Sequence, residues 1–393
     1  MDFLQEFIKK ESSAGITLIF VTFLALLLKN SALSELYEAF LHTPVEIRFG
    51  ALHIDKPLLL WINDGLMAVF FMLIGLEVKR ELIEGHLSTP SQIVLPGIAA
   101  IGGMLIPALF YVYFNEGDAI AMSGWAIPTA TDIAFALGIL SLLGKAVPIS
   151  LKIFLMALAI IDDLGAIVII ALFYTVKLST LSITIAAISL AVLIFMNYRG
   201  VVKKAAYIIV GVILWVSVLK SGVHATLAGV ALAFTIPYKS RMPDGSEYSM
   251  SKEIEQDLHF WVAFFVLPLF AFVNAGVDLR QVSLEQMTGP VPLGIMAGLF
   301  FGKQIGVFGF SFLAIKLKIA KMPECASWQQ LYGVAILTGI GFTISFFVDS
   351  LAFKDDTLYQ HADRLAILLS SFMAGLLGYF VLRYSKESRA LKK

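Results

Sequence analysis

The chain has 393 residues, of which 59% are hydrophobic and 15% are charged, and its formal net charge is zero. Soluble domains carry roughly 25% charged and 45–50% apolar residues, so this composition, with a mean hydropathy of +0.85, excludes a soluble globule of this length. The balanced charge gives no support for nucleic-acid binding, and a single cysteine, Cys325, excludes an internal disulfide.

Long apolar runs dominate the sequence and indicate that lipid is its second solvent. Backbone groups inside a bilayer must satisfy one another, which leaves helices or a closed barrel. The runs lack the two-residue alternation of a barrel, so we predict an all-α polytopic membrane protein. A span needs about 20 apolar residues, and twelve segments are expected to cross the bilayer: 12–29, 57–77, 93–114, 120–142, 150–174, 180–198, 205–219, 222–237, 258–277, 290–315, 328–350 and 360–383.

The distribution of basic residues predicts how these spans are oriented. The first span follows Lys9 and Lys10 and lacks a small-residue cleavage site, so it is expected to remain as a helix. With the N-terminus in the cytoplasm, 20 of the 29 Lys and Arg residues fall on the cytoplasmic side and eight on the other. Positive charge concentrates on the cytoplasmic side of membrane proteins, so both termini are predicted to be cytoplasmic.

Two spans, the fourth and the eleventh, contain helix breakers at their centres. Residues 126–132 resemble residues 335–341, and the breakers are Pro128 in the first segment and Gly339 and Gly341 in the second. Interrupted segments at matching positions in two halves of a chain point to a transporter site built on inverted repeats. Between the first two spans, partial alternation about Gly50 predicts a short outer β-hairpin near 45–54.

Asp162 and Asp163 are adjacent carboxyl residues at the centre of the fifth span. Each costs about 2.5–3.5 kcal/mol to insert if it is charged, so such residues are rare unless they function. Their helical neighbours, such as Ala159 and Gly165, are small and leave room for an ion or water. Burial and like charge both favour the protonated form of a carboxyl group. The pair is therefore predicted to exchange protons against a cation. The alternative is a structural role, with one Asp in a salt bridge and the other hydrogen-bonded.

Three further residues are expected to act near this pair. Asp132 and Thr131 lie where the fourth span breaks and are candidate cation ligands, although Asp132 could instead offset the positive end of a half-helix. Lys303 is the one basic residue deep in a span. It lies one residue away from a face of glycines at 294, 298, 302 and 306, a pattern that lets helix backbones pack closely. Asp162 or Asp163 is its expected counter-ion, either as a structural pair or as a pair that opens during transport.

A second group of titratable residues lies near the ends of spans. Histidine titrates near neutral pH, and residues three or four apart share a helical face, so these residues are candidates for a pH response. Ion-paired or hydrogen-bonded helix ends are the alternative. The candidates are Glu77, Arg80, Glu81, His224, Glu255 and His259. No motif for nucleotide, zinc or covalent catalysis is found, so we expect neither an enzyme nor a cofactor.

Several separate stretches together resemble the NhaA family of bacterial Na+/H+ antiporters over nearly the whole chain. The similar stretches are 75–81, 128–135, 161–165, 221–226, 269–276, 302–303 and 338–343. The resemblance implies twelve helices with crossed, interrupted fourth and eleventh helices in the bacterial inner membrane. It divides the single membrane domain of residues 1–393 into a core bundle of about 93–177 plus 290–385 and an interface part of about 10–86 plus 180–278. The hairpin would contribute to a homodimer.

The resemblance also implies what the residues do. Na+ or Li+ would be expelled in exchange for inward protons, electrogenically and with activation at alkaline pH. Asp162 and Asp163 would bind Na+ and protons, and Asp132 and Lys303 would offset the half-helix ends. The six candidates above would belong to the pH-responsive set, where Gln256 replaces a family histidine and cannot titrate.

The residues alone leave two other functions open. One is a secondary transporter of another solute with a similar interrupted-helix design, and the other is a passive cation channel.

Overall fold

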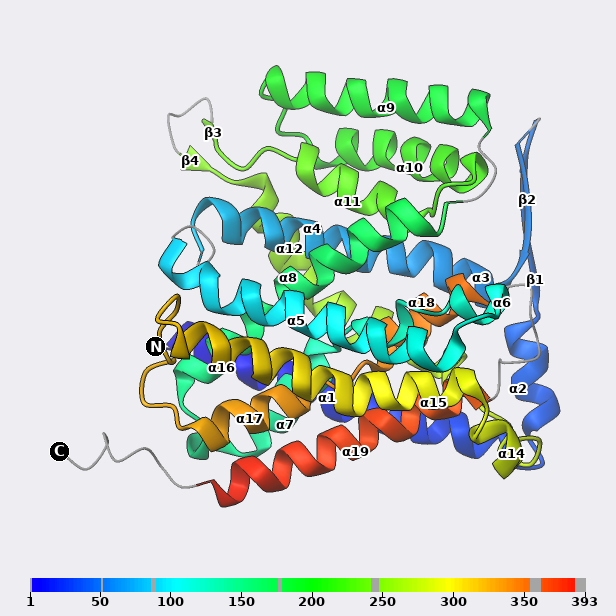
Figure 1. Ribbon diagram of the computed structural model, residues 1–393. Coiled ribbons are helices and arrows are strands. Elements are labelled where there is room, and N and C mark those ends of the chain that lie inside the picture. Colours follow the sequence, from blue (N-terminus) through cyan, green and yellow to red (C-terminus); the bar gives the residue numbers. More distant parts are fainter. Residues whose placement is uncertain are drawn as a thin grey trace. The chain divides into compact units, whose positions relative to one another are not determined.

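The computed structural model describes residues 2–50, 52–85, 90–175, 179–241, 247–353 and 362–385, which form the helices and short strands of Figure 1. It confirms the all-α polytopic fold. Within the described residues nine helical spans are long and apolar enough to cross a membrane, or up to eleven when two bent pairs are each counted as one span. The nine are Leu58–Ile83, Ile93–Asn115, Ala119–Leu142, Ile149–Phe173, Thr180–Tyr198, Lys204–Ser221, Met250–Asn274, Pro290–Lys316 and Ala362–Tyr384.

The segment predicted at 222–237 is helical but short. Its helix, α11 (Thr226–Thr235), has ten residues, half of what a bilayer requires. Gly222 ends the preceding helix in the left-handed region at φ 89°, and Pro237 follows Ile236 at the other end. These two stops shorten the segment. About twelve spans are expected from the sequence; among the described residues there are up to eleven, and the remaining expected span is this short helix.

The chain forms two compact units. The first comprises residues 1–34, 86–166 and 274–393. Its helices are α1 (Asp2–Lys29), α5 (Pro90–Asn115), α6 (Ala119–Met122), η3 (Ile127–Thr129), α7 (Ile133–Leu142), η4 (Gly144–Ala146), α8 (Ile149–Phe173, up to Ala166), α14 (Leu284–Met287), α15 (Pro290–Met296), η6 (Ala297–Gly302), η7 (Gln304–Phe308), α16 (Gly309–Lys316), α17 (Trp328–Leu337), α18 (Phe342–Ala352) and α19 (Ala362–Tyr384).

Helix α1 belongs to this first unit. The expected division instead places residues 10–86, and so most of α1, in the interface part. Helix α1 joins the first unit because it packs on α7. A Cβ at Gly15 would be 3.2 Å from both Ala134 O and Gly138 Cα, so two small residues let these helices approach closely.

The second unit comprises residues 35–85 and 167–273. Its elements are α2 (Ser34–Leu41), β1 (Pro44–Phe49), β2 (Leu52–Pro57), α3 (Leu58–Trp61), η1 (Ile62–Leu66), α4 (Met67–Ile83), the end of α8, α9 (Thr180–Tyr198), α10 (Lys204–Ser221), α11, β3 (Ser240–Arg241), β4 (Glu247–Tyr248), α12 (Met250–Trp261), η5 (Val262–Val266) and α13 (Leu267–Asn274). β1 and β2 are antiparallel, with Arg48 opposite His53 and Gly50 at φ 57° in the turn, so a hairpin stands where alternation predicts one.

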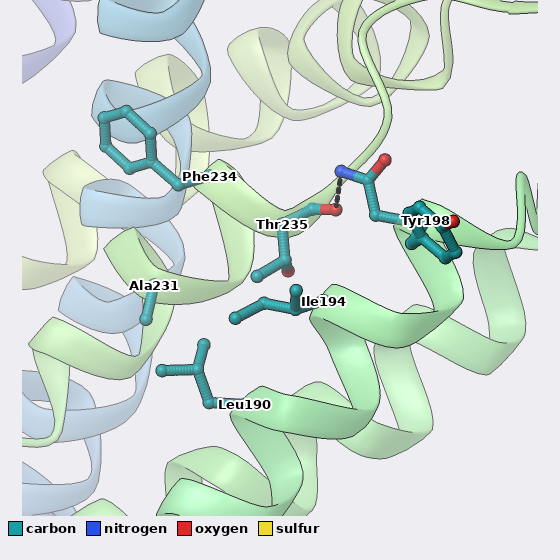
Figure 2. Close-up of a pocket in the computed structure, with 7 residues that line it drawn as sticks. Leu190, Ile194, Tyr198, Ala231, Phe234 and Thr235 are labelled. Carbon is teal, nitrogen blue, oxygen red and sulfur yellow. Dashed lines mark hydrogen bonds between the residues drawn. The ribbon is translucent and has the colours of Figure 1, made fainter.

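The core of the second unit includes Leu76, Tyr207, Ala233 and Met250, all almost fully buried. By contrast, α9 is mostly exposed, as an outer lipid-facing helix would be. A cavity of about 580 Å³ lies between α9 and α11, and Figure 2 shows side chains that line it. At its edge, Asn197 Nδ2 donates a 2.7 Å hydrogen bond to Thr235 O. The lining contains no carboxylate, so this cavity offers no charged ligand for a cation.

Candidate functional site

A buried ion pair joins two of the predicted site residues in the first unit. Lys303 Nζ lies 2.9 Å from Asp162 Oδ2, and the two residues are 0% and 2% exposed. The second carboxylate oxygen, Asp162 Oδ1, is also buried and has no hydrogen-bond partner among the described residues. A buried acceptor without a partner is costly, so this oxygen is poised to bind a cation or a proton.

The position of Lys303 follows from the glycine face next to it. The span that carries Lys303 runs beside α5 (Figure 1). A Cβ at Gly302 would be 2.7 Å from Pro107 Cα, and one at Gly306 would overlap the carbonyl of Gly102. The backbones are therefore in close contact, and Lys303, one residue further along, lies between two π-helical turns, η6 and η7. π-Turns inside α-helices frequently mark functional sites.

Asp163 shares this environment. It is 4% exposed and close enough to Lys303 to interact electrostatically with its ammonium group. A Cβ added at Gly165 would be 3.0 Å from Met104 Cε. Gly165 is predicted to leave room beside the two carboxyl groups, and the side chain of Met104 lies in that room. One ammonium group thus serves two buried carboxyl groups.

Asp132 connects the ends of two half-helices. Its Oδ1 accepts a 3.0 Å hydrogen bond from Phe135 N and caps α7. Its Oδ2 accepts bonds from the backbone nitrogen and the hydroxyl of Thr343, at 3.2 and 2.6 Å, in the first turn of α18. Helix N-termini carry partial positive charge, and one carboxylate therefore faces two of them. These contacts fit the alternative in which Asp132 offsets half-helix ends.

The two interruptions meet directly. Asp132 N donates to Ile340 O at 2.6 Å, and Thr131 Oγ1 donates to Thr338 O at 3.0 Å. Helices α17 and α18 form an angle of 41° at their break. A glycine is required at position 339 because the backbone of Leu299 approaches it closely: an added Cβ would be 2.5 Å from Leu299 O. Broken helices leave backbone groups free, and here each break supplies partners for the other.

Pro128 and Gly341 complete the interrupted segments. Pro128 is buried in the short 3₁₀ helix η3. A Cβ added at Gly298 would be 2.6 Å from the Cβ of Pro128. A Cβ at Gly341 would be 2.8 Å from Leu299 Cδ2. The breaks therefore pack against the span that carries Lys303.

Comparison with known proteins supports the resemblance found in the motifs. The family described as Na+/H+ antiporter 1 matches residues 5–382. The chain belongs to this family. A relative from a Sulfurovum species, named Na(+)/H(+) antiporter NhaA, is 70% identical over 387 residues, which cover 98% of this chain and 99% of the relative.

Two further relatives bear the same name. The one from a Nitratiruptor species is 62% identical, over 96% of this chain and 97% of its own. The one from Pseudomonas putida is 58% identical, over 95% of each chain. Family membership thus rests on nearly the full length of each protein.

In the second unit of this family member, Arg80 gathers part of the predicted pH-responsive set. Its guanidinium lies 2.9 Å from Glu81 Oε1 and 2.8 Å from Glu255 Oε1. Glu81 and Glu255 are buried, and Glu255 Oε2 has no hydrogen-bond partner among the described residues. Glu77 and His259 lie near enough to this cluster for electrostatic interaction. Five of the six candidates therefore form one group.

The surroundings of this cluster include an exposed ion pair and an exposed glutamine. Lys252 Nζ donates to Glu84 Oε2 at 2.5 Å, and this hydrogen bond lowers the pKa of Glu84 below its ordinary value. Gln256 is exposed next to the buried Glu255.

His224 stands apart from the Arg80 cluster. Its Nε2 is 2.6 Å from Tyr174 O, and it precedes the N-terminus of α11. The neighbour of Arg80, Lys79, contacts the opposite end of α11 through the carbonyl of Ile236. Ten helical residues, roughly 15 Å, separate these ends. The sequence groups the six residues by type, and only the fold divides them.

Four polar residues are not among the candidates predicted from the sequence. They are Lys79, Asp349, Asp363 and Arg364. Lys79 donates to the carbonyls of Ala233, Phe234 and Ile236 at the end of α11. Asp349 and Asp363 are buried near the ends of their helices, where a carboxyl is easily mistaken for a loop residue. Their signal in the sequence was the placement of two acids within predicted spans.

Proposed function

We propose that this chain expels Na+ or Li+ from the bacterial cytoplasm in exchange for protons. The observation that carries the proposal is the buried pair of Lys303 and Asp162, in which one carboxylate oxygen has no partner. Membership of the Na+/H+ antiporter 1 family supports it. The names of the relatives favour neither a carrier of an organic solute nor a passive channel.

In the proposed mechanism, Na+ and protons compete for Asp162 and Asp163. Na+ is a hard cation and takes oxygen ligands, which a carboxylate provides together with water, hydroxyl and carbonyl oxygens. When Na+ binds, it takes over the charge compensation of Asp162 from Lys303, and protons leave the protonated Asp163 and the released Lys303 ammonium group. When protons return from the other side, they displace Na+ and the ion pair re-forms. Electrogenic exchange requires that more than one proton is displaced for each Na+, so the two loaded states differ in net charge.

Alternating access provides the movement that this competition needs. We assign the core bundle to the spans of about 93–177 and 290–385, which carry the breaks, Asp162, Asp163 and Lys303, and the interface part to the spans of the second unit. Thr131 and Asp132 hold the two interruptions together, so they would keep the half-helices aligned while the site changes its exposure. Exchange is proposed to be electrogenic, with both termini in the cytoplasm and with β1 and β2 contributing to a homodimer.

The Arg80 cluster is the proposed pH-responsive element. Its buried carboxylates, Glu81 and Glu255, share one guanidinium, so a change in protonation alters the balance of charge among them. Glu77, His259 and the separate His224 complete the set. Gln256 cannot titrate, and the pH profile of activation is therefore expected to be shifted or less steep than with a histidine there.

The test is Na+-induced proton movement in everted membrane vesicles. Asp163→Asn keeps the shape of the side chain but removes the charge that exchanges Na+ for a proton, so we expect exchange to be abolished. Glu116→Gln makes a comparable change at an exposed carboxyl and should leave exchange unchanged. Full activity of Asp163→Asn would refute the proposed site.

The same measurement in proteoliposomes separates the other functions. A clamped membrane potential reports whether exchange is electrogenic. Steady Na+ conductance without proton movement would indicate a channel, and transport that requires an organic solute would indicate another carrier.

A further inference from the structure

A second pair of buried carboxyl groups lies where α18 and α19 contact each other in the first unit. Asp349 lies near the C-terminal end of α18 and is 2% exposed. Asp363 lies in the first turn of α19 and is fully buried. Residues 354–361, which join the two helices, lie outside the described residues. Two acids in spans are expensive unless something compensates them.

One arginine serves both acids. Arg364 Nε is 3.6 Å from Asp349 Oδ2, and the backbone nitrogen of Arg364 donates to Asp363 Oδ1 at 2.7 Å. The remaining oxygens, Asp349 Oδ1 and Asp363 Oδ2, are buried and have no donor among the described residues. Two ionised carboxylates beside one guanidinium would leave a net negative charge and two unpartnered oxygens in the interior.

Both carboxyl groups contact the same arginine, and their side chains interact with each other. Two carboxylates have only acceptors, so this contact becomes a hydrogen bond only when one of them carries a proton. A single proton would supply the missing donor and bring the net charge of the two acids and Arg364 to zero. Paired carboxyls in other proteins share a proton for the same reason.

Among the residues described, the neighbouring elements offer few competing charges, and one of them is Asp132, which binds Thr343 in the first turn of α18. Within α18 and α19 the other ionisable side chains are Arg383 and two tyrosines, more than four turns further along α19. Of the elements that pack most closely on these helices, η3, η6, α7 and α15 contain no charged residue, and α17 carries one tyrosine but no charge. α14 contributes Glu285, which is exposed to solvent. Among the described residues of this junction, the charge balance is therefore set by Asp349, Asp363 and Arg364.

We propose that Asp349 and Asp363 together bind one proton and form a proton-binding site separate from Asp162 and Asp163. The site lies on the helix that contacts Asp132, since Thr343 and Asp349 are six residues apart on α18, about 9 Å. Loss of the proton would place a buried negative charge on this half-helix. The inference does not require the proposed exchange function, because it concerns protonation of the folded protein.

The test compares the wild type with Asp349→Asn, in which an amide stands in for the protonated acid and can donate to Asp363. The folded wild type holds a proton that its unfolded chain releases, so its stability should fall as pH rises through the range in which the pair deprotonates. We expect the melting temperature of Asp349→Asn to be close to wild type at acidic pH and higher than wild type at alkaline pH. Infrared spectra of the reconstituted variant should lack one protonated-carboxyl band.

Glu285→Gln is the control, because it removes an exposed carboxyl from the neighbouring α14, and it should behave as the wild type does. If Asp349→Asn does not fold, Asp363→Asn provides the same test from the other side of the pair. The proposal is overturned if the variant and the wild type show the same pH dependence and the same infrared band. It is also overturned if Na+ raises the melting temperature of the wild type but not of Asp349→Asn, and the wild type lacks the protonated-carboxyl band. The pair would then hold a cation instead of a proton.

Discussion

Lys303 is a fully buried ammonium group whose charge is compensated by Asp162. Burying two charges costs several kcal/mol per ion, and their attraction offsets this only in good geometry. Such a pair adds little stability overall, but either partner alone is strongly unfavourable. This asymmetry suits a site in which a cation replaces one of the partners.

Lys303→Met should therefore destabilise the protein by about 3–5 kcal/mol, because Asp162 keeps its charge without a partner. Added Na+ should restore part of the loss, since a ligand that binds only the folded state stabilises it by mass action. Melting temperatures in detergent with increasing NaCl, and with choline chloride at matched ionic strength, measure both effects.

A double variant completes this test. Asp162→Asn combined with Lys303→Met removes both charges and should recover most of the stability without a response to Na+. Wild-type stability of Lys303→Met at every salt concentration would mean that the pair is not buried as observed.

The sequence predicts which charged residues are buried in the spans better than it predicts which residues they contact. Depth in an apolar span is enough to single out Asp162, Asp163 and Lys303, because burial of charge is visible in the residue types alone. It leaves open which carboxyl pairs with Lys303, since that depends on the rotation of two helices. For Asp132 the sequence likewise offers two roles, and the bonds to Phe135 and Thr343 favour the one in which it offsets half-helix ends.

At the scale of an element, the glycine face of the Lys303 span is the feature that positions the site. Gly306 opposes the backbone of Gly102, so an added methyl group has no flexible side chain to displace. Gly309, one turn further along the same span, has no heavy atom within 4 Å of where its Cβ would be. The two glycines make a matched pair.

Gly306→Ala should separate the two helices and cost about 1–3 kcal/mol or more, as overpacking does. It should also weaken Na+/H+ exchange, because Lys303 moves with its helix. Gly309→Ala should be neutral or stabilising by up to about 1 kcal/mol, since alanine favours helix. Melting temperature and vesicle exchange are measured for both variants, and equal effects would show that close packing is not the cause.

The short helix α11 shows what the sequence could not reveal about an element. Its apolar composition suggests a span, but its C-terminal carbonyls are reached by Lys79 Nζ and Asn197 Nδ2. Carbonyl groups at a helix end inside an apolar environment need such donors. Gly222 and Pro237 mark the limits of this segment in the sequence. The donors that satisfy its C-terminal carbonyls come from distant parts of the chain, so they leave no local signal and could not be predicted.

At the scale of the whole molecule, composition alone establishes the polytopic fold, because few charges cannot cover a soluble surface of this size. The motifs establish the family through their order along the chain. The division into two compact units is less accessible, since α1 joins the first unit through contacts of Gly15 that no periodicity reveals. What the charge pattern does predict at this scale is which side of the membrane each loop faces.

Cys325 allows that orientation to be tested without any substitution. It is the one cysteine in the sequence and is exposed, in the loop between α16 and α17. This loop carries Lys318 and Lys321, so the bias of basic residues places it in the cytoplasm. A membrane-impermeant maleimide should label everted vesicles and not right-side-out vesicles. A permeant maleimide should label both, and Cys325→Ser should abolish labelling in each. Labelling of right-side-out vesicles alone would reverse the proposed topology, and with it the direction in which Na+ is moved.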